Sequence, residues 1–443
     1  MKTIRALANT FAILSAIYSG LILVKNRMPW GILIWPLRLV AGALSPFVAL
    51  SGLVSALLGL ISGSPLAALA GLFAAVTSAR YVWKSVKFDD GFAGAFGADW
   101  WERIPDERKS RMLHGHWTWL MPAPPQVAHE RDVPFATIPG TSRQLLCDLW
   151  LPSMCVEPSG LAFIYLHGSA WYLGDKDMGT RLLFRQLAAQ GHLIMDVAYR
   201  MSPETDMFGM VGDAKRAVAW LKEHGAQYGV DPDRIVIGGA SAGSHITMLA
   251  AFSGDHPELT PLDLQGLELG VCGVVAIYGP SDLTANYYHT AQHITTRELE
   301  RELTVSKPGL VRQLLQSLMG ERYTHMGLHK PTQTSAFLYL LGGHPEELPE
   351  KYELFSPVHH VHPGCPPTLL IHGGEDLLVP VEGTLALEKK LRAAGVPVVS
   401  LILPQTDHAF DLVLPRWSPP AQAALYEIER FLAIMALPDN PSQ

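Results

Sequence analysis

The chain has 443 residues, of which 48% are hydrophobic and only 17% charged, below the roughly 25% of an ordinary soluble domain. Its 34 Lys and Arg residues and 41 Asp and Glu residues give a formal net charge of −7. This composition excludes a disordered chain, a coiled coil and a protein that binds nucleic acid through a basic surface.

Residues 1–88 differ from the rest of the chain in charge. They contain eight Lys and Arg and no acid, since the first acidic residue is Asp89. Within them, residues 6–24 form an apolar run without charge, flanked by basic residues on both sides. A cleaved signal peptide is the alternative for this run, but more apolar sequence follows at once and no clean cleavage site stands out. We therefore favour a membrane-spanning helix.

A second uncharged stretch, residues 39–79, is interrupted only by the turn-forming sequence Ser62-Gly63-Ser64-Pro65. Because a helix needs about 20 residues to cross the hydrocarbon core, this stretch predicts a helical hairpin, Leu39–Ile61 followed by Pro65–Trp83. Residues 1–88 are thus predicted to form a membrane anchor of two to three transmembrane helices.

Basic residues near the spans predict the orientation of the anchor. With three spans, Lys2 and Arg5 lie on one side of the membrane, and six basic residues lie on the other: Lys25, Arg27, Arg38, Arg80, Lys84 and Lys87. Basic residues concentrate on the cytoplasmic side, so we expect a multi-pass membrane protein with the large C-terminal domain in the cytoplasm.

After an amphipathic linker or cap segment, residues 89–125, short apolar runs alternate with segments of helical length over residues 126–443. This alternation predicts a doubly wound, mostly parallel α/β sheet. The expected strands are a hairpin, 133–138 and 144–151, and then 161–166, 193–198, 235–237, 271–278, 368–371 and 398–403. The expected helices are 176–190, 210–228, 242–252, 381–394 and 421–435. Residues 284–350 interrupt the alternation of strands and helices and are too long for a plain connection, so they predict a helical cap insertion.

The pentapeptide Gly239-Ala240-Ser241-Ala242-Gly243 follows a predicted strand and opens a predicted helix. A G-x-S-x-G sequence alone is a weak signal, but this context is typical of a tight turn that exposes a nucleophilic serine. Ser241 is therefore the candidate nucleophile.

A serine becomes a good nucleophile when a base removes its proton and an acid orients that base. In a fold of this kind, the acid and then the histidine follow the serine, each after a later strand. Asp376 and His408 stand at these places. Glu375 and, more distantly, Asp282 are competing acids.

Acyl transfer also needs backbone N–H groups that bind the oxyanion of the tetrahedral intermediate. One donor is expected from Ala242, directly after the nucleophile. The others are expected from the loop after the strand 161–166, at Gly168, Ser169 and Ala170.

Residues 161–410 resemble the hormone-sensitive-lipase-like carboxylesterases, the α/β-hydrolase fold-3 family. His167-Gly168-Ser169-Ala170-Trp171 stands where that family carries H-G-G-G-W/F, and Tyr199-Arg200-Met201-Ser202-Pro203-Glu204 resembles its Y-R-L-A-P-E segment. The serine pentapeptide resembles its G-D-S-A-G. The resemblance implies an α/β-hydrolase fold, the triad Ser241, His408 and Asp376, and no cofactor. No metal is expected either, because His359, His360, His362 and Cys365 lack the separated ligand pairs of a zinc site.

Three departures from the family pattern stand out. Ser169 and Ala170 replace two glycines, so their side chains are expected to narrow the substrate space, and Ala240 replaces the acid before the nucleophile. The third departure is the apolar N-terminus, which is similar to membrane-anchored branches such as the arylacetamide deacetylase-like enzymes and the isoprenylcysteine methylesterases. The H-G-x-A-W form of the oxyanion loop is similar to that of the methylesterases.

We therefore predict a membrane-bound serine esterase or lipase-like hydrolase whose partners are a lipophilic small-molecule ester and membrane lipid, with no nucleic acid. An isoprenylcysteine methylesterase, or an acyltransferase or amidase with the same triad, is the alternative enzyme. A catalytically silent scaffold is the alternative of another class, and the oligomeric state stays open.

Overall fold

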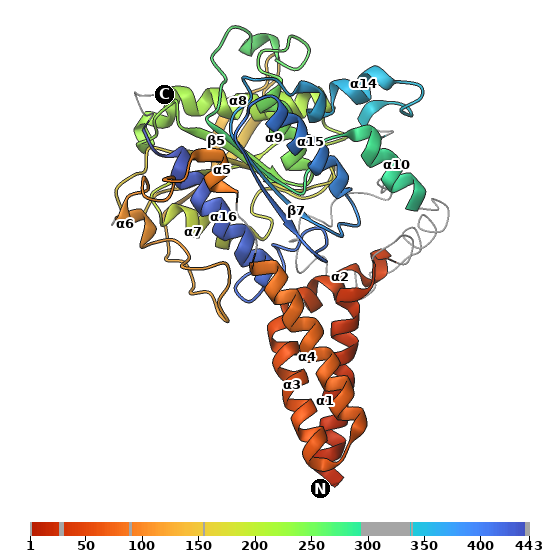
Figure 1. Ribbon diagram of the computed structural model, residues 1–443. Coiled ribbons are helices and arrows are strands. Elements are labelled where there is room, and N and C mark those ends of the chain that lie inside the picture. The colour runs from red at the N-terminus through yellow and green to blue at the C-terminus, as the bar shows by residue number, and fades with distance from the viewer. Residues whose placement is uncertain are drawn as a thin grey trace.

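The computed structural model describes residues 2–25, 31–87, 91–153, 156–293, 337 and 340–438. The N-terminal helices form an elongated bundle that projects from a globular α/β domain, and helix α2 lies between the two (Figure 1).

Three long helices form the bundle: α1 (Lys2–Leu23), α3 (Ser45–Ser62) and α4 (Pro65–Val86). Small residues bring α3 and α4 together, since a Cβ added at Gly59 would lie 2.5 Å from the backbone nitrogen of Ala68. Many Leu, Ile, Val and Phe side chains on the outside of the bundle are exposed. All three helices are long and apolar enough to cross a membrane.

The start of the predicted hairpin differs from the structure. Residues 39–43 belong to α2 (Gly31–Ala43), and a separate helix begins at Ser45, so the expected helix Leu39–Ile61 is wrong at its start. Pro46 lacks a backbone N–H and suits a first helical turn, while the Ser45 hydroxyl donates to the carbonyl of Gly42 at 2.7 Å. This break lets α2 leave the bundle and reach the globular domain.

The globular domain is built on one sheet with strand order β1-β2-β4-β3-β5-β6-β7-β8. The strands β1 and β2 form an antiparallel hairpin at one edge, β2 pairs antiparallel with β4, and all other pairs are parallel. The predicted fold class is confirmed. The strands are β1 (His129–Thr137), β2 (Gln144–Trp150), β3 (Ala162–Leu166), β4 (Leu193–Ala198), β5 (Ile235–Ala240), β6 (Gly273–Ile277), β7 (Thr368–Gly373) and β8 (Val398–Leu403).

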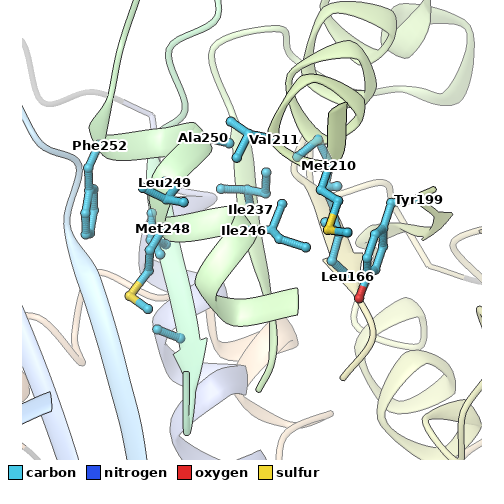
Figure 2. Packing of buried hydrophobic residues seen from close by; sticks show 14 of the residues in the cluster. Leu166, Tyr199, Met210, Val211, Ile237, Ile246, Met248, Leu249, Ala250 and Phe252 are labelled. Atoms are coloured by element: carbon cyan, nitrogen blue, oxygen red, sulfur yellow. The ribbon is translucent and has the colours of Figure 1, made fainter. Parts of the chain in front are cut away.

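Helices cover both faces of this sheet, as a doubly wound fold requires. On β5, Ile235 and Ile237 belong to one core cluster, with α8, α9 and α15, whereas Val236 belongs to the other, with α7 and α16. Figure 2 shows Ile237 packed among side chains of α8 and α9. The helices are α7 (Arg181–Ala188), α8 (Met207–His224), α9 (Ala242–Phe252), α15 (Val381–Ala393) and α16 (Pro419–Met435).

One helix of the domain is shorter than predicted. α7 begins at Arg181 rather than at Lys176, because Asp177 and Gly179 have φ values of 64° and 76°, outside the helical region. The carboxylate of Asp196 accepts the N–H of Asp177 at 2.6 Å and fixes this loop instead.

Residues 91–125 contain two short helices, α5 (Phe92–Phe96) and α6 (Asp106–Lys109), and pack on the α16 side of the sheet. From the predicted cap insertion, the structure describes α10 (Leu283–His293) and α14 (Pro349–Leu354), whereas residues 294–336 lie outside the described residues. Short 3₁₀ helices complete the described part: η1 (Gly225–Tyr228), η2 (Leu262–Leu264) and η4 (Pro357–His360).

Candidate active site

Ser241 occupies the sharp turn from β5 into α9. Its backbone has a φ of 53° and a ψ of −121°, a strained conformation for a residue with a side chain. The residues around it must be small, because a Cβ at Gly239 or Gly243 would lie 2.3 or 2.1 Å from the carbonyl oxygen of Leu166. The turn thereby holds the hydroxyl at the N-terminus of α9, in the strand–turn–helix context that the pentapeptide predicts.

The structure brings Ser241, His408 and Asp376 together from three different loops. His408 follows β8, and its Nε2 lies 3.0 Å from the Oγ of Ser241. Asp376 follows β7, and its Oδ2 lies 2.7 Å from the Nδ1 of His408. Because β5, β7 and β8 are parallel strands of one sheet, their carboxyl ends meet at the same edge.

The environment of Asp376 keeps its carboxylate ionised. Burial by itself would raise the pKa of Asp376, but the charge of His408 and hydrogen bonds from His372 and His408 outweigh it and hold this pKa well below the usual value. The other carboxylate oxygen accepts the N–H groups of Leu378 and Val379, each at 2.8 Å. An ionised Asp376 requires the proton of a neutral His408 on Nδ1, which leaves Nε2 free to accept one from Ser241.

His372 is a neighbour of the acid that the sequence analysis did not single out. Its Nε2 lies 3.3 Å from the Oδ2 of Asp376 and 3.1 Å from the carbonyl oxygen of Val379. Both are acceptors, so Nε2 carries the proton and Nδ1 accepts the hydroxyl of Thr384 at 2.7 Å. The sequence signal that could have identified His372 is a histidine directly after the predicted strand 368–371, four residues before the candidate acid.

The competing acids have other partners. The Oε2 of Glu375 lies 3.3 Å from the Nη2 of Arg38, on α2. Asp282 accepts the backbone N–H of Ala285 at 2.9 Å in the first turn of α10. Asp407, directly before the histidine, lies 3.2 Å from the Nε of Arg38. In the sequence, Arg38 is visible only as one of the basic residues that predict the orientation of the anchor.

Two of the four predicted oxyanion donors, Gly168 and Ala242, lie beside Ser241. A Cβ added at Gly168 would lie 3.2 Å from the Cβ of Ser241, so the loop after β3 approaches the serine closely. Ser169 and Ala170 continue this loop, and Ala170 has a φ of 47°. Ala242 is the first residue of α9, where the first N–H groups have no partner within the helix.

Ser169 stabilises the loop after β3, residues 167–171, which we call the oxyanion loop. Its hydroxyl lies 2.5 Å from that of Tyr199 and accepts the N–H of Trp171 at 2.9 Å. Tyr199 donates to the carbonyl of His167 at 2.9 Å, so the Ser169 hydroxyl donates to Tyr199. The sequence predicts that this side chain narrows the substrate space, but the structure shows it buried and hydrogen-bonded within its own loop and to Tyr199.

His245, one turn after Ser241, also supports the oxyanion loop. Its Nδ1 accepts the indole N–H of Trp171 at 3.2 Å, and its Nε2 donates to the carbonyl of Phe355 at 2.7 Å. Burial lowers the pKa of His245 to about 4, so it is neutral near pH 7. Both nitrogens are occupied, which leaves none for Ser241.

His359, His360 and His362 stand close together in the sequence. Within the described ranges, no group of three or more His, Cys, Asp or Glu side chains converges as metal ligands would. His360 instead lies 2.7 Å from the carbonyl of Leu354 through its Nε2.

Comparison with curated proteins gives relatives over the same part of the chain. The probable carboxylic ester hydrolase LipM of Mycobacterium tuberculosis is 30% identical over 308 residues, which cover 69% of this chain and 61% of LipM. The isoprenylcysteine alpha-carbonyl methylesterase ICME of Arabidopsis thaliana is 27% identical over 290 residues, 62% of this chain and 57% of ICME. The chain thus spans about three-fifths of the length of these relatives.

Among solved structures, a truncated carbohydrate esterase from gut microbiota superposes with a TM-score of 0.52 and 21% identity, covering 72% of this chain and 99% of that protein. This likeness shows the shared fold. The BD-FAE family profile matches residues 147–391, more than half of the chain. The chain therefore belongs to the BD-FAE family, among the α/β-hydrolase fold-3 esterases that its motifs resemble.

Proposed function

We propose that this protein is a serine carboxylester hydrolase that acts on lipophilic carboxylic esters. The observation that carries the proposal is the chain of contacts from Ser241 through His408 to Asp376, at 3.0 and 2.7 Å. A curated relative is named a probable carboxylic ester hydrolase, which supports the same chemistry.

The proposed reaction follows from the positions of these groups. His408 takes the proton of Ser241 as its Oγ attacks the ester carbonyl, and Asp376 stabilises the imidazolium that forms. Backbone N–H groups of Gly168, Ser169, Ala170 and Ala242 bind the oxyanion. His408 then protonates the leaving alcohol and an acyl-enzyme remains. Water, activated by the same histidine, releases the acid and frees the serine.

The position of the bundle supports a lipophilic substrate. The indole N–H of Trp35, on α2, donates to the carbonyl of His408 at 3.1 Å, so the candidate site lies at the end of the domain that carries the bundle. An aromatic cluster of Phe47, Trp119 and Trp417 lies at this junction, with ring centroids 5.7 Å apart in two pairs. Exposed aromatic side chains of this kind favour a membrane–water interface.

We expect hydrolysis of a p-nitrophenyl ester series, acetate through palmitate, to peak at medium or long acyl chains. The reason is that a site next to a bilayer receives substrates that partition into it. Detergent-solubilised protein and protein in lipid nanodiscs should both be measured. A profile that peaks at acetate would contradict the lipophilic substrate, and no hydrolysis of any ester would favour a silent scaffold.

We further propose that residues 1–88 anchor the protein through three spans, with the catalytic domain in the cytoplasm. Lys2 and Arg5 belong to the first turn of α1, at the N-terminal tip of the bundle. Lys84 and Lys87 follow Tyr81, which contacts Thr406 of the domain, and Lys25 follows Ile22, which packs against Tyr81. Arg38 does not count toward this charge difference, because it is buried against the domain.

This topology predicts opposite accessibilities for two engineered cysteines. Ile61→Cys, in the exposed last turn of α3, should react with a membrane-impermeant maleimide in intact cells, and Lys87→Cys should react only after lysis. The wild-type chain is the control for native thiols. The reverse pattern would place the domain outside, and release by alkaline carbonate would exclude an integral anchor.

An isoprenylcysteine methyl ester is the second candidate substrate, since ICME is a relative of this chain. A prenyl group would partition into the bilayer beside the site, and the same triad would hydrolyse the methyl ester. Hydrolysis of a farnesylcysteine methyl ester much faster than of any p-nitrophenyl ester would favour this candidate. Acyl transfer to an added alcohol or amine in preference to water would instead favour an acyltransferase.

A further inference from the structure

The anchor contacts the loop that carries the candidate base at three points. Trp35 on α2 donates to the carbonyl of His408, as described above. The hydroxyl of Tyr81 on α4 lies 3.1 Å from that of Thr406, two residues before the histidine. Arg38 on α2 forms ion pairs with both Glu375 and Asp407. The residues that contact each other here are more than 320 positions apart in the sequence.

Asp407 links the two loops that carry the acid and the base. One of its carboxylate oxygens, Oδ1, accepts the backbone N–H of Leu377 and that of His408, both at 2.9 Å. Leu377 directly follows Asp376, so a single oxygen holds the residue after the acid and the base itself. The other oxygen, Oδ2, lies 3.2 Å from the Nε of Arg38.

This link depends on charge. The side chains of Arg38 and Asp407 are only 2% and 3% exposed. A carboxylate buried to this extent is costly unless an opposite charge lies close, and removing one partner of such a pair leaves an uncompensated charge. The side chain of Glu375 is more exposed, at 26%, and its Oε2 lies 3.3 Å from the Nη2 of the same guanidinium.

We propose that Arg38 is a positioning residue for the reaction: through Asp407 and Glu375, the anchor helix α2 sets the loops that hold His408 and Asp376. This inference rests on the proposed ester hydrolysis. Arg38 reaches Ser241 and substrate only through these loops, so it acts on the rate of the chemical step. A shift of His408 by a fraction of an ångström lengthens its 3.0 Å contact with Ser241.

The test compares Arg38→Gln with Arg80→Gln in the full-length protein in nanodiscs. Arg80 is an exposed arginine of the same anchor and serves as the matched control. For Arg38→Gln we expect kcat to fall by about tenfold or more with KM within about twofold, because misplacing a catalytic group slows chemistry without removing a substrate contact. Arg38→Lys, which keeps one charge, should recover part of kcat. Arg80→Gln should match wild type.

Two further variants, Asp407→Asn and the double variant Arg38→Gln/Asp407→Asn, distinguish a loss of positioning from a folding defect. Asp407→Asn keeps an oxygen for the two N–H groups but loses the charge. If Arg38 acts through Asp407, the double variant should be no slower than the slower single variant, because residues that act as one unit are not additive. A normal kcat per active site in Arg38→Gln, or fully additive losses, would overturn the proposal even if the melting temperature falls.

The rate of labelling by a fluorophosphonate separates this proposal from the proposed function. If wild type hydrolyses no ester but is labelled at Ser241, ester hydrolysis fails while slower labelling of Arg38→Gln still supports positioning. If wild type is labelled and Arg38→Gln is labelled equally fast, positioning fails alone. If wild type does neither reaction, both are wrong.

Discussion

Replacing Ser241 with alanine should reduce ester hydrolysis by roughly ten-thousandfold or more, to the rate set by binding and the oxyanion donors alone. The alanine removes the only atom that attacks the carbonyl and leaves the turn unchanged, because alanine is smaller than serine. The measurement is kcat on the best ester of the series, together with labelling by a fluorophosphonate, which should disappear.

Ser253→Ala is the matched control for this variant, since Ser253 directly follows the last residue of α9 and lies outside the candidate site. Its kcat should be that of wild type. Equal rates in Ser241→Ala and wild type, with both proteins folded, would assign the nucleophile elsewhere and remove the basis of the proposed function.

Asp376→Asn should lower kcat by roughly ten-thousandfold, the loss expected when an amide replaces the acid of such a triad. The amide can donate to Nδ1 of His408, which stabilises the tautomer that cannot accept the proton of Ser241. It also removes the negative charge that stabilises the imidazolium. The low pKa of Asp376, set against burial by His408 and His372, means that wild type keeps this charge at every pH used for assay.

Asp282→Asn controls for the loss of a carboxylate near the sheet edge. The amide oxygen can still accept the N–H of Ala285, so activity should stay within about twofold of wild type. The kcat of Glu375→Gln should lie between those of Asp282→Asn and Asp376→Asn. This variant weakens one ion pair with Arg38 and loses no contact with His408. A larger loss in Glu375→Gln than in Asp376→Asn would exchange the two acids in the mechanism.

The globular fold could be predicted from the sequence because local signals agree with the tertiary structure. Each central strand is a short apolar run that the sheet buries on both faces, and α9 covers the predicted range 242–252. The helix boundaries that the sequence predicts wrongly lie where the local backbone geometry departs from the hydrophobic pattern. Leu39 to Ala43 are as apolar as the span that follows, so only the proline at position 46 marks the break.

The candidate triad could be predicted for a related reason. Ser241, Asp376 and His408 each follow a strand, and parallel strands bring their carboxyl ends to one edge whatever their separation in the chain. The contact of Arg38 with Asp407 could not be predicted from the sequence, because this contact depends on how α2, a helix outside the sheet, packs against the domain. A lone arginine in an apolar segment was the visible signal, and it indicated membrane orientation more readily than a partner.

The contact between α2 and the loop of His408 has a consequence for the synthesis and folding of the protein. Trp35 precedes His408 by 373 positions, so the ribosome must translate the whole intervening chain before the two residues can meet. At typical elongation rates this delay lasts on the order of half a minute. The residues that we propose as the membrane anchor are thus synthesised well before the candidate active site can be completed.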